Sequence, residues 1–173
     1  MHVLVATDGS LDPTRTASFA VPLAGDGGKV TVLTVVEINR TMLRDLRALY
    51  GERSVKPPDQ DAEYVGLRPD PSTGVSADWP GDDRMIGRYL DDQATARTAA
   101  LVEALESAGA PGVDMLAREG EDPAAVIVET AERLAADVVV VGATGKGAFE
   151  VLLGSTGTKL ARRAPCPVLI IRP

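Results

Sequence analysis

The sequence is poor in the residue types on which metal binding and nucleophilic catalysis most often depend. Its 173 residues include one cysteine and one histidine. A single cysteine cannot form an internal disulfide, and the lone His2 excludes a Cys/His metal cluster and most Ser/His or Cys/His catalytic arrangements. We therefore predict no catalytic residues and no metal site.

Long apolar runs are also missing. No segment approaches the roughly 20 apolar residues of a membrane-spanning helix, and the chain opens with an apolar strand instead of a signal peptide. Acidic residues outnumber basic ones by 25 to 18, for a net charge of −7, which disfavours nucleic acid and anionic membranes as partners. We therefore expect a soluble, cytoplasmic protein that binds neither. A local anion site built from backbone amides is still compatible with this charge.

Short apolar runs alternate with helical patterns along most of the chain. Strands are predicted at residues 2–7, 29–36, 113–117, 136–141 and 167–172. Helices are predicted between them at residues 12–24, 85–108, 122–134 and 155–163. Two of these helices start with Asp-Pro, an N-cap followed by a residue suited to the first helical position. The alternation predicts an α/β fold, an open parallel sheet with helices on both faces and a ligand site beyond the carboxyl ends of its strands.

The middle of the chain lacks this alternation. A short helix is predicted at residues 42–50, and residues 51–84 then contain five prolines, eight acidic and four basic residues without a sustained period. Such a composition predicts a mobile surface loop. The long Ala-rich helix that follows carries one stripe of residues at helical spacing, namely Leu90, Ala94, Arg97, Leu101, Leu105 and Ala108. We therefore predict one domain over residues 1–173 with a flexible acidic insertion at 51–84, which offers a surface to a protein partner.

Glycines and hydroxyl side chains gather after the fourth predicted strand. The residues concerned are Gly142, Gly145, Lys146, Gly154, Ser155 and Thr156. A sharp turn at the glycines followed by a helix N-terminus aims backbone amides at one place, where a phosphate binds well, and Lys146 would neutralise part of its charge. Alternatively, the glycines serve only a tight turn and Ser155 only caps a helix. The Walker P-loop is excluded, because Gly147 stands where that motif needs Ser or Thr.

Segments at both ends of the chain resemble the universal stress proteins. The resemblance lies in HVLVATDGS and VTVLTVVE near the start, and in residues 121–173 with their closing APCPVLIIRP. It implies a five-stranded parallel sheet in the order 3-2-1-4-5 and a homodimer that pairs through the terminal strand, 167–172. In the nucleotide-binding branch of the family, two glycines separated by two residues precede Gly-Ser/Thr by nine residues. Here eight residues, 146–153, take the place of nine.

The resemblance also implies a ligand and the residues that hold it. The ligand is ATP, with or without Mg, bound without catalysis beyond slow hydrolysis. Gly142, Gly145, Gly154, Ser155 and Thr156 resemble the phosphate side of the family's pocket. On the adenosine side, Asp8 matches an acidic residue, Val35 matches a residue whose main chain meets adenine, and Thr7 and Val141 line the same cleft. A carboxylate at Asp8 can instead cap the turn at Gly9-Ser10.

Two hypotheses about function remain open from the sequence. The first is a non-catalytic nucleotide-binding regulator in which bound ATP orders the ends of the strands. The second is a nucleotide-free scaffold of the same fold, which acts through protein–protein interaction and is favoured by the shortened glycine spacing and the acidic insertion. An enzyme is the third interpretation, and we find no general base besides Asp8 to support it.

Overall fold

The computed structural model describes residues 1–38, 82–143 and 155–172. Its elements in chain order are β1 (His2–Ala6), α1 (Pro13–Ala24), β2 (Lys29–Val36), α3 (Asp82–Ser107), β3 (Val113–Glu119), α4 (Pro123–Arg133), β4 (Val138–Gly142), α5 (Ser155–Arg163) and β5 (Val168–Ile171). The chain divides into two compact units, Met1–Glu37 with Leu90–Pro173, and Ile38–Tyr89. The sheet and the candidate site lie in the first of these units.

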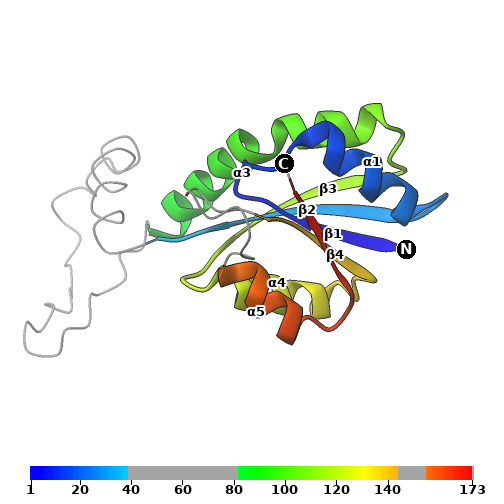
Figure 1. Ribbon diagram of the computed structural model, residues 1–173. Helices are drawn as coiled ribbons and strands as arrows, with labels where there is room; N and C mark the ends of the chain where they lie inside the picture. Colours follow the sequence, from blue (N-terminus) through cyan, green and yellow to red (C-terminus); the bar gives the residue numbers. More distant parts are fainter. Residues whose placement is uncertain (39–81, 144–154, 173) are drawn as a thin grey trace, which may run out of the picture. The chain divides into compact units, whose positions relative to one another are not determined.

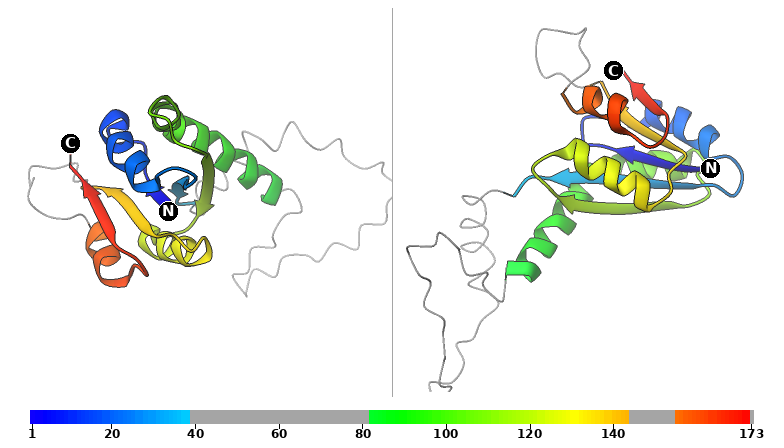
Figure 2. Two further views of the ribbon diagram at one scale, coloured as in Figure 1. Left: turned by 90° about the vertical axis from the view of Figure 1, so that its right-hand side faces the viewer. Right: turned by 90° about the horizontal axis from the view of Figure 1, so that it is seen from below.

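All five strands form one parallel sheet. Its order is β3-β2-β1-β4-β5, and every neighbouring pair runs parallel. α1 and the part of α3 from Leu90 cover one face, and α4 and α5 cover the other (Figures 1 and 2). The predicted α/β fold and the strand order implied by the family resemblance are therefore confirmed.

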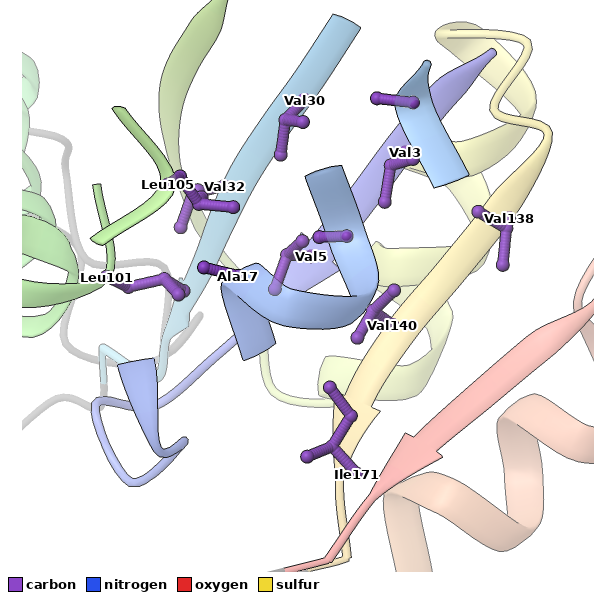
Figure 3. Close-up of a cluster of buried hydrophobic side chains, with 12 residues drawn as sticks. Val3, Val5, Ala17, Val30, Val32, Leu101, Leu105, Val138, Val140 and Ile171 are labelled. Atoms are coloured by element: carbon purple, nitrogen blue, oxygen red, sulfur yellow. The ribbon is translucent and has the colours of Figure 1, made fainter. Parts of the chain in front are cut away.

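The central strand β1 contributes to two separate apolar cores. Val3 and Val5 point to the face of α1 and α3, and Leu4 and Ala6 point to the face of α4 and α5. Figure 3 shows the first core, in which valines of β1, β2 and β4 meet Ala17, Leu101, Leu105 and Ile171. Because both faces are covered, β4 and β1 after its first residue are apolar, and β2 after its first residue departs from this pattern only at its buried Thr31 and Thr34.

The two Asp-Pro motifs begin helices as predicted. Asp12 Oδ1 accepts a hydrogen bond from the backbone amide of Arg15 at 2.6 Å, and Pro13 is the first residue of α1. Asp122 Oδ1 accepts from the amide of Ala124 at 3.2 Å before α4. Both carboxylates thus satisfy amides that have no partner within their own helices.

Several predicted boundaries are wrong by a few residues. Helix α3 begins at Asp82 instead of residue 85, inside the segment predicted as a loop. Strand β3 continues to Glu119 because Val36 of β2 is there to pair with it. Strand β4 begins at Val138, since the amide of Ala136 still bonds to the end of α4. β1 and β5 are slightly shorter than predicted.

The remaining prediction for the middle of the chain cannot be compared with the structure. The short helix predicted at residues 42–50 and residues 51–81 of the predicted acidic insertion lie outside the described residues.

Candidate functional site

A cavity of about 240 Å³ opens at the carboxyl ends of β1, β2 and β4. Parallel strands present these ends at the same edge of a sheet, where ligands of α/β proteins bind. The cavity brings together most of the residues that the sequence singled out, from segments far apart in the chain: Thr7, Asp8, Val35, Val141, Gly142, Ser155 and Thr156. Gly145, Lys146 and Gly154 lie outside the described residues.

Gly142 belongs to β4, one residue beyond the predicted end of this strand. It is the last residue of β4 and pairs with Ile171 of β5, so the strand continues through it. Residues 144–154, where the sequence predicts a sharp turn, lie outside the described residues. Gly142 still lines the cavity, at the carboxyl end of β4.

The turn after β1 is held by its own side chains. Asp8 Oδ1 accepts hydrogen bonds from the amide of Ser10 at 3.0 Å and from its hydroxyl at 2.5 Å, and Thr7 Oγ1 accepts from the amide of Gly9 at 3.0 Å. Gly9 has a φ of 94°, in the region that favours glycine. The interpretation of Asp8 as a turn cap is thus confirmed, and the same residue also lines the cavity.

The environment of Asp8 favours its ionised form. Partial burial raises the pKa of this carboxyl, but the hydrogen bonds from Ser10 and the nearby Arg97 cation outweigh that effect and lower the pKa below its ordinary value. Both hydrogen bonds from Ser10 fall on Oδ1 of Asp8. The same carboxylate lines the cavity, where it can accept from a ligand hydroxyl or amine.

The main chain of Val35 faces the cavity side of β2. In a parallel pair of strands, alternate residues point their main-chain groups to the same neighbour. The carbonyl of Leu33 accepts from the amide of Thr7 at 2.9 Å and so faces β1. Val35 lies two residues further and faces the same side, but β1 has ended there. Its main-chain groups consequently point into the space where the cavity begins.

Arg97 contacts this position, which the sequence did not foresee. Its guanidinium Nη1 donates a hydrogen bond to the carbonyl oxygen of Val35 at 3.2 Å. The sequence placed Arg97 only in the stripe that α3 turns toward the body of the protein. A basic side chain among the apolar and Ala residues of that stripe was the available signal, because a charge is seldom turned inward without a polar partner.

The N-terminus of α5 forms another wall. The helix begins at Ser155, as predicted, and Gly157 and Leu160 are its buried residues. Lys159 Nζ lies 3.0 Å from Asp122 Oδ2 and joins α5 to the start of α4. This contact with Lys159 lowers the pKa of the Asp122 carboxyl. The sequence did not single out the other lining residues, which are Ala6, Ser10, Leu11, Leu33, Pro123, Ile127 and Gly157.

The lining of the cavity carries little charge within the described residues. Asp8 is the one titratable side chain among the described residues that line the cavity. In the described ranges, His, Cys, Asp and Glu side chains form no group of three or more that could hold a metal ion. Among the helices of those ranges, none has the length and apolarity needed to cross a membrane.

Sequence comparison relates nearly the whole chain to one family. The model of the universal stress protein family matches residues 1–172. Stress response protein NhaX of Bacillus subtilis is 27% identical over 177 residues, which cover 99% of this chain and 97% of that protein. Universal stress protein MJ0531 of Methanocaldococcus jannaschii is 47% identical over 51 residues, but the match covers only 29% of this chain and 30% of that protein.

Solved structures of similar fold point the same way. UspA from Lactobacillus plantarum is similar with a TM-score of 0.58 at 23% identity, over 99% of this chain and 97% of that one. A universal stress protein in complex with cAMP has a TM-score of 0.54 at 22% identity, and the match covers 99% of this chain and 96% of that one. The universal stress protein from Archaeoglobus fulgidus in complex with dAMP has a TM-score of 0.51 at 20% identity, and the match covers 99% of this chain and 97% of that one. These similarities concern the fold, and together with the family match over residues 1–172 they lead to the conclusion that this chain belongs to the universal stress protein family.

Proposed function

We propose that this protein is a non-catalytic regulator that binds ATP in the cavity at the carboxyl ends of β1, β2 and β4. The observation that carries the proposal is the meeting of the turn after β1, the end of β2 and the N-terminus of α5 around one cavity. Acceptors for a nucleoside and amides for phosphates come from different segments of the chain and lie within reach of one ligand.

The nucleoside fits the side of the cavity formed by β1 and β2. Asp8 offers a carboxylate acceptor for ribose hydroxyls, and the lowered pKa of this carboxyl keeps it ionised at neutral pH. Leu11, Leu33 and Ile127 supply apolar surface for the base. A volume of about 240 Å³ lies just below the about 300 to 1,000 Å³ of typical small-molecule pockets, which suits a nucleoside with its phosphates extending outward.

The phosphates fit the N-terminus of α5. The first amides of a helix have no partner within it, and the helix dipole favours negative charge there. The hydroxyls of Ser155 and Thr156 add donors at the same place. Gly145, Lys146 and Gly154 belong to this side by the family resemblance, and Mg would accompany the phosphates. Two of the solved relatives, which are complexes with cAMP and dAMP, support an adenine nucleotide as the ligand class.

Regulation would follow from the stabilisation that the ligand brings. A ligand that binds only the native state stabilises it by about 2.7 kcal/mol at a hundredfold excess over its dissociation constant. Bound ATP would thereby link the turn after β1 to the start of α5. We also propose that β5, an edge strand of the sheet, pairs with a second copy of the chain. A protein partner at residues 51–84 remains a proposal from the sequence.

Thermal unfolding with and without Mg-ATP tests the proposal. A domain of this size gains about 2 to 4 °C per kcal/mol, so a near-saturating concentration should raise the melting temperature by roughly 5 to 10 °C. Gly142→Val places a branched side chain at the cavity and should abolish this shift. Gly112→Val is the matched control, because a Cβ at Gly112 meets no atom within 4 Å, and it should keep the shift.

The opposite result would favour the other hypothesis. Should millimolar Mg-ATP leave the melting temperature of the wild-type protein unchanged, nucleotide binding is refuted and the scaffold hypothesis takes its place. Equal shifts in Gly142→Val and in the wild type would show that ATP binds elsewhere.

A further inference from the structure

Arg97 brings a positive charge to the main chain of Val35, one of the residues that line the cavity. Its guanidinium donates to the Val35 carbonyl at 3.2 Å, and its charge is close enough to Asp8 to favour the ionised carboxylate. The backbone of Arg97 also packs on the turn after β1, since its Cα lies 3.5 Å from where a Cβ of Gly9 would stand. Arg97 is therefore held against both the end of β2 and the turn after β1.

The carbonyl that Arg97 uses is the acceptor that the fold leaves exposed at the end of β2. The carbonyl of Leu33 accepts a hydrogen bond from the amide of Thr7. The carbonyl of Val35 has no such partner in β1, because Val35 lies past the end of that strand. A carbonyl oxygen has two lone pairs, and a guanidinium has five N–H donors. In the described part of the chain, the guanidinium of Arg97 uses one of these donors on Val35.

We propose that Arg97 is a specificity-determining residue of the nucleotide site and shifts base preference from a 6-amino toward a 6-oxo purine. The inference rests on the proposed function, because it requires a nucleotide in the cavity. An exocyclic amine that approaches the Val35 carbonyl must share it with the guanidinium and place its own positive hydrogens beside a full positive charge. An oxygen at the same ring position is an acceptor and meets a donor instead.

Known base recognition supports this direction of the effect. A guanidinium is the commonest specific partner of the purine O6 and N7 acceptors, whereas adenine is paired with side chains that offer an acceptor as well as a donor. Here the acceptor at the end of β2 is the Val35 carbonyl oxygen, which already accepts a hydrogen bond from Arg97. The cation therefore weakens the preference for adenine that an unshared Val35 carbonyl would give.

ATP and ITP are the probes that isolate this effect. They carry the same ribose and triphosphate and differ in the purine at C6, where ITP has an oxygen in place of the amine. Dissociation constants of both are measured by calorimetry for the wild type, Arg97→Met and Arg97→Lys. Methionine keeps an unbranched side chain on the helix but removes the charge and all donors. Arg133→Met is the control, since Arg133 is an exposed arginine in the last turn of α4.

The ratio of the dissociation constants, ITP over ATP, should rise at least about fivefold in Arg97→Met, the lower end of what one good base contact discriminates. Arg97→Lys keeps the charge on a single ammonium and should raise the ratio by less. Arg133→Met should match the wild type. If Arg97→Met does not fold, the ratio of the ITP and ATP dissociation constants of Arg97→Lys tests the inference instead.

Two results would overturn the inference, and they differ. If ATP and ITP bind and their ratio is unchanged in the Arg97 variants, Arg97 does not set base preference and nucleotide binding stands. If the wild type binds neither nucleotide, the proposed function fails and the inference fails with it.

Discussion

Leu160 anchors α5 to the core, and truncating this side chain allows an effect on stability to be distinguished from an effect on ligand binding. Leu160 is fully buried and is the one large apolar residue among the buried residues of this nine-residue helix. Leu105 of α3 is equally buried, but it packs in the core on the opposite face of the sheet. The two leucines are therefore matched in side chain and burial and differ in the helix that they anchor.

Truncating either leucine should destabilise the protein to a similar extent. A buried Leu→Ala change costs about 2 to 5 kcal/mol, which for a chain of this length lowers the melting temperature by roughly 4 to 20 °C. Only Leu160→Ala should also weaken ATP binding, because α5 supplies Ser155 and Thr156 to the cavity. Loss of one hydrogen bond to a charged group corresponds to about a tenfold weaker affinity.

Urea unfolding measures the first effect, and calorimetric titration with Mg-ATP, at a temperature where both variants are folded, measures the second. Leu105→Ala should bind ATP within about twofold of the wild type, a change of less than half a kcal/mol. If both variants lose affinity equally, the loss reflects general loosening, and the assignment of α5 to the phosphates is refuted. If neither variant loses affinity, α5 does not contact the ligand.

Two further predictions concern β5 and Cys166, which lies two residues before this strand. The carbonyls of Pro167 and Ile171 accept from amides at Val139 and Ala143, so the amide of Ile170 points to the open edge of the sheet. Ile170→Pro removes this amide and should make the proposed dimer monomeric in analytical sedimentation, whereas Ile170→Ala should stay dimeric. A monomeric wild-type protein would contradict the pairing. Burial, and after it the Asp137 carboxylate, raises the pKa of the Cys166 thiol. Alkylation by iodoacetamide at about pH 8.5, the ordinary pKa of a free thiol, should therefore be slower in the native protein than in the unfolded chain, and native Asp137→Asn should react faster than the native wild type. Equal rates in all three samples would contradict this account.

Much of the fold was predictable because its signals are local. An Asp-Pro pair sets the start of a helix by the geometry of two residues, and both predicted starts, at Pro13 and Pro123, are confirmed. Strand β2 was predicted with its observed bounds, since residues 29–36 are apolar or β-branched nearly throughout. The bounds of β3 were not predictable in this way, because its last residues are ordered by pairing with Val36.

For the candidate site, the sequence by itself determined which segments end at the carboxyl edge of the sheet. That follows from the alternation of strands and helices, which placed Asp8 and Ser155 at this edge. The family resemblance added Val141, and all three residues line the cavity. The tertiary structure alone decided what the sequence left open. It shows that Asp8 both caps its turn and lines the cavity, that Gly142 continues β4, and that Arg97 reaches the Val35 carbonyl. A local pattern cannot contain such facts, because they depend on the register of paired strands and on a contact between residues 62 positions apart.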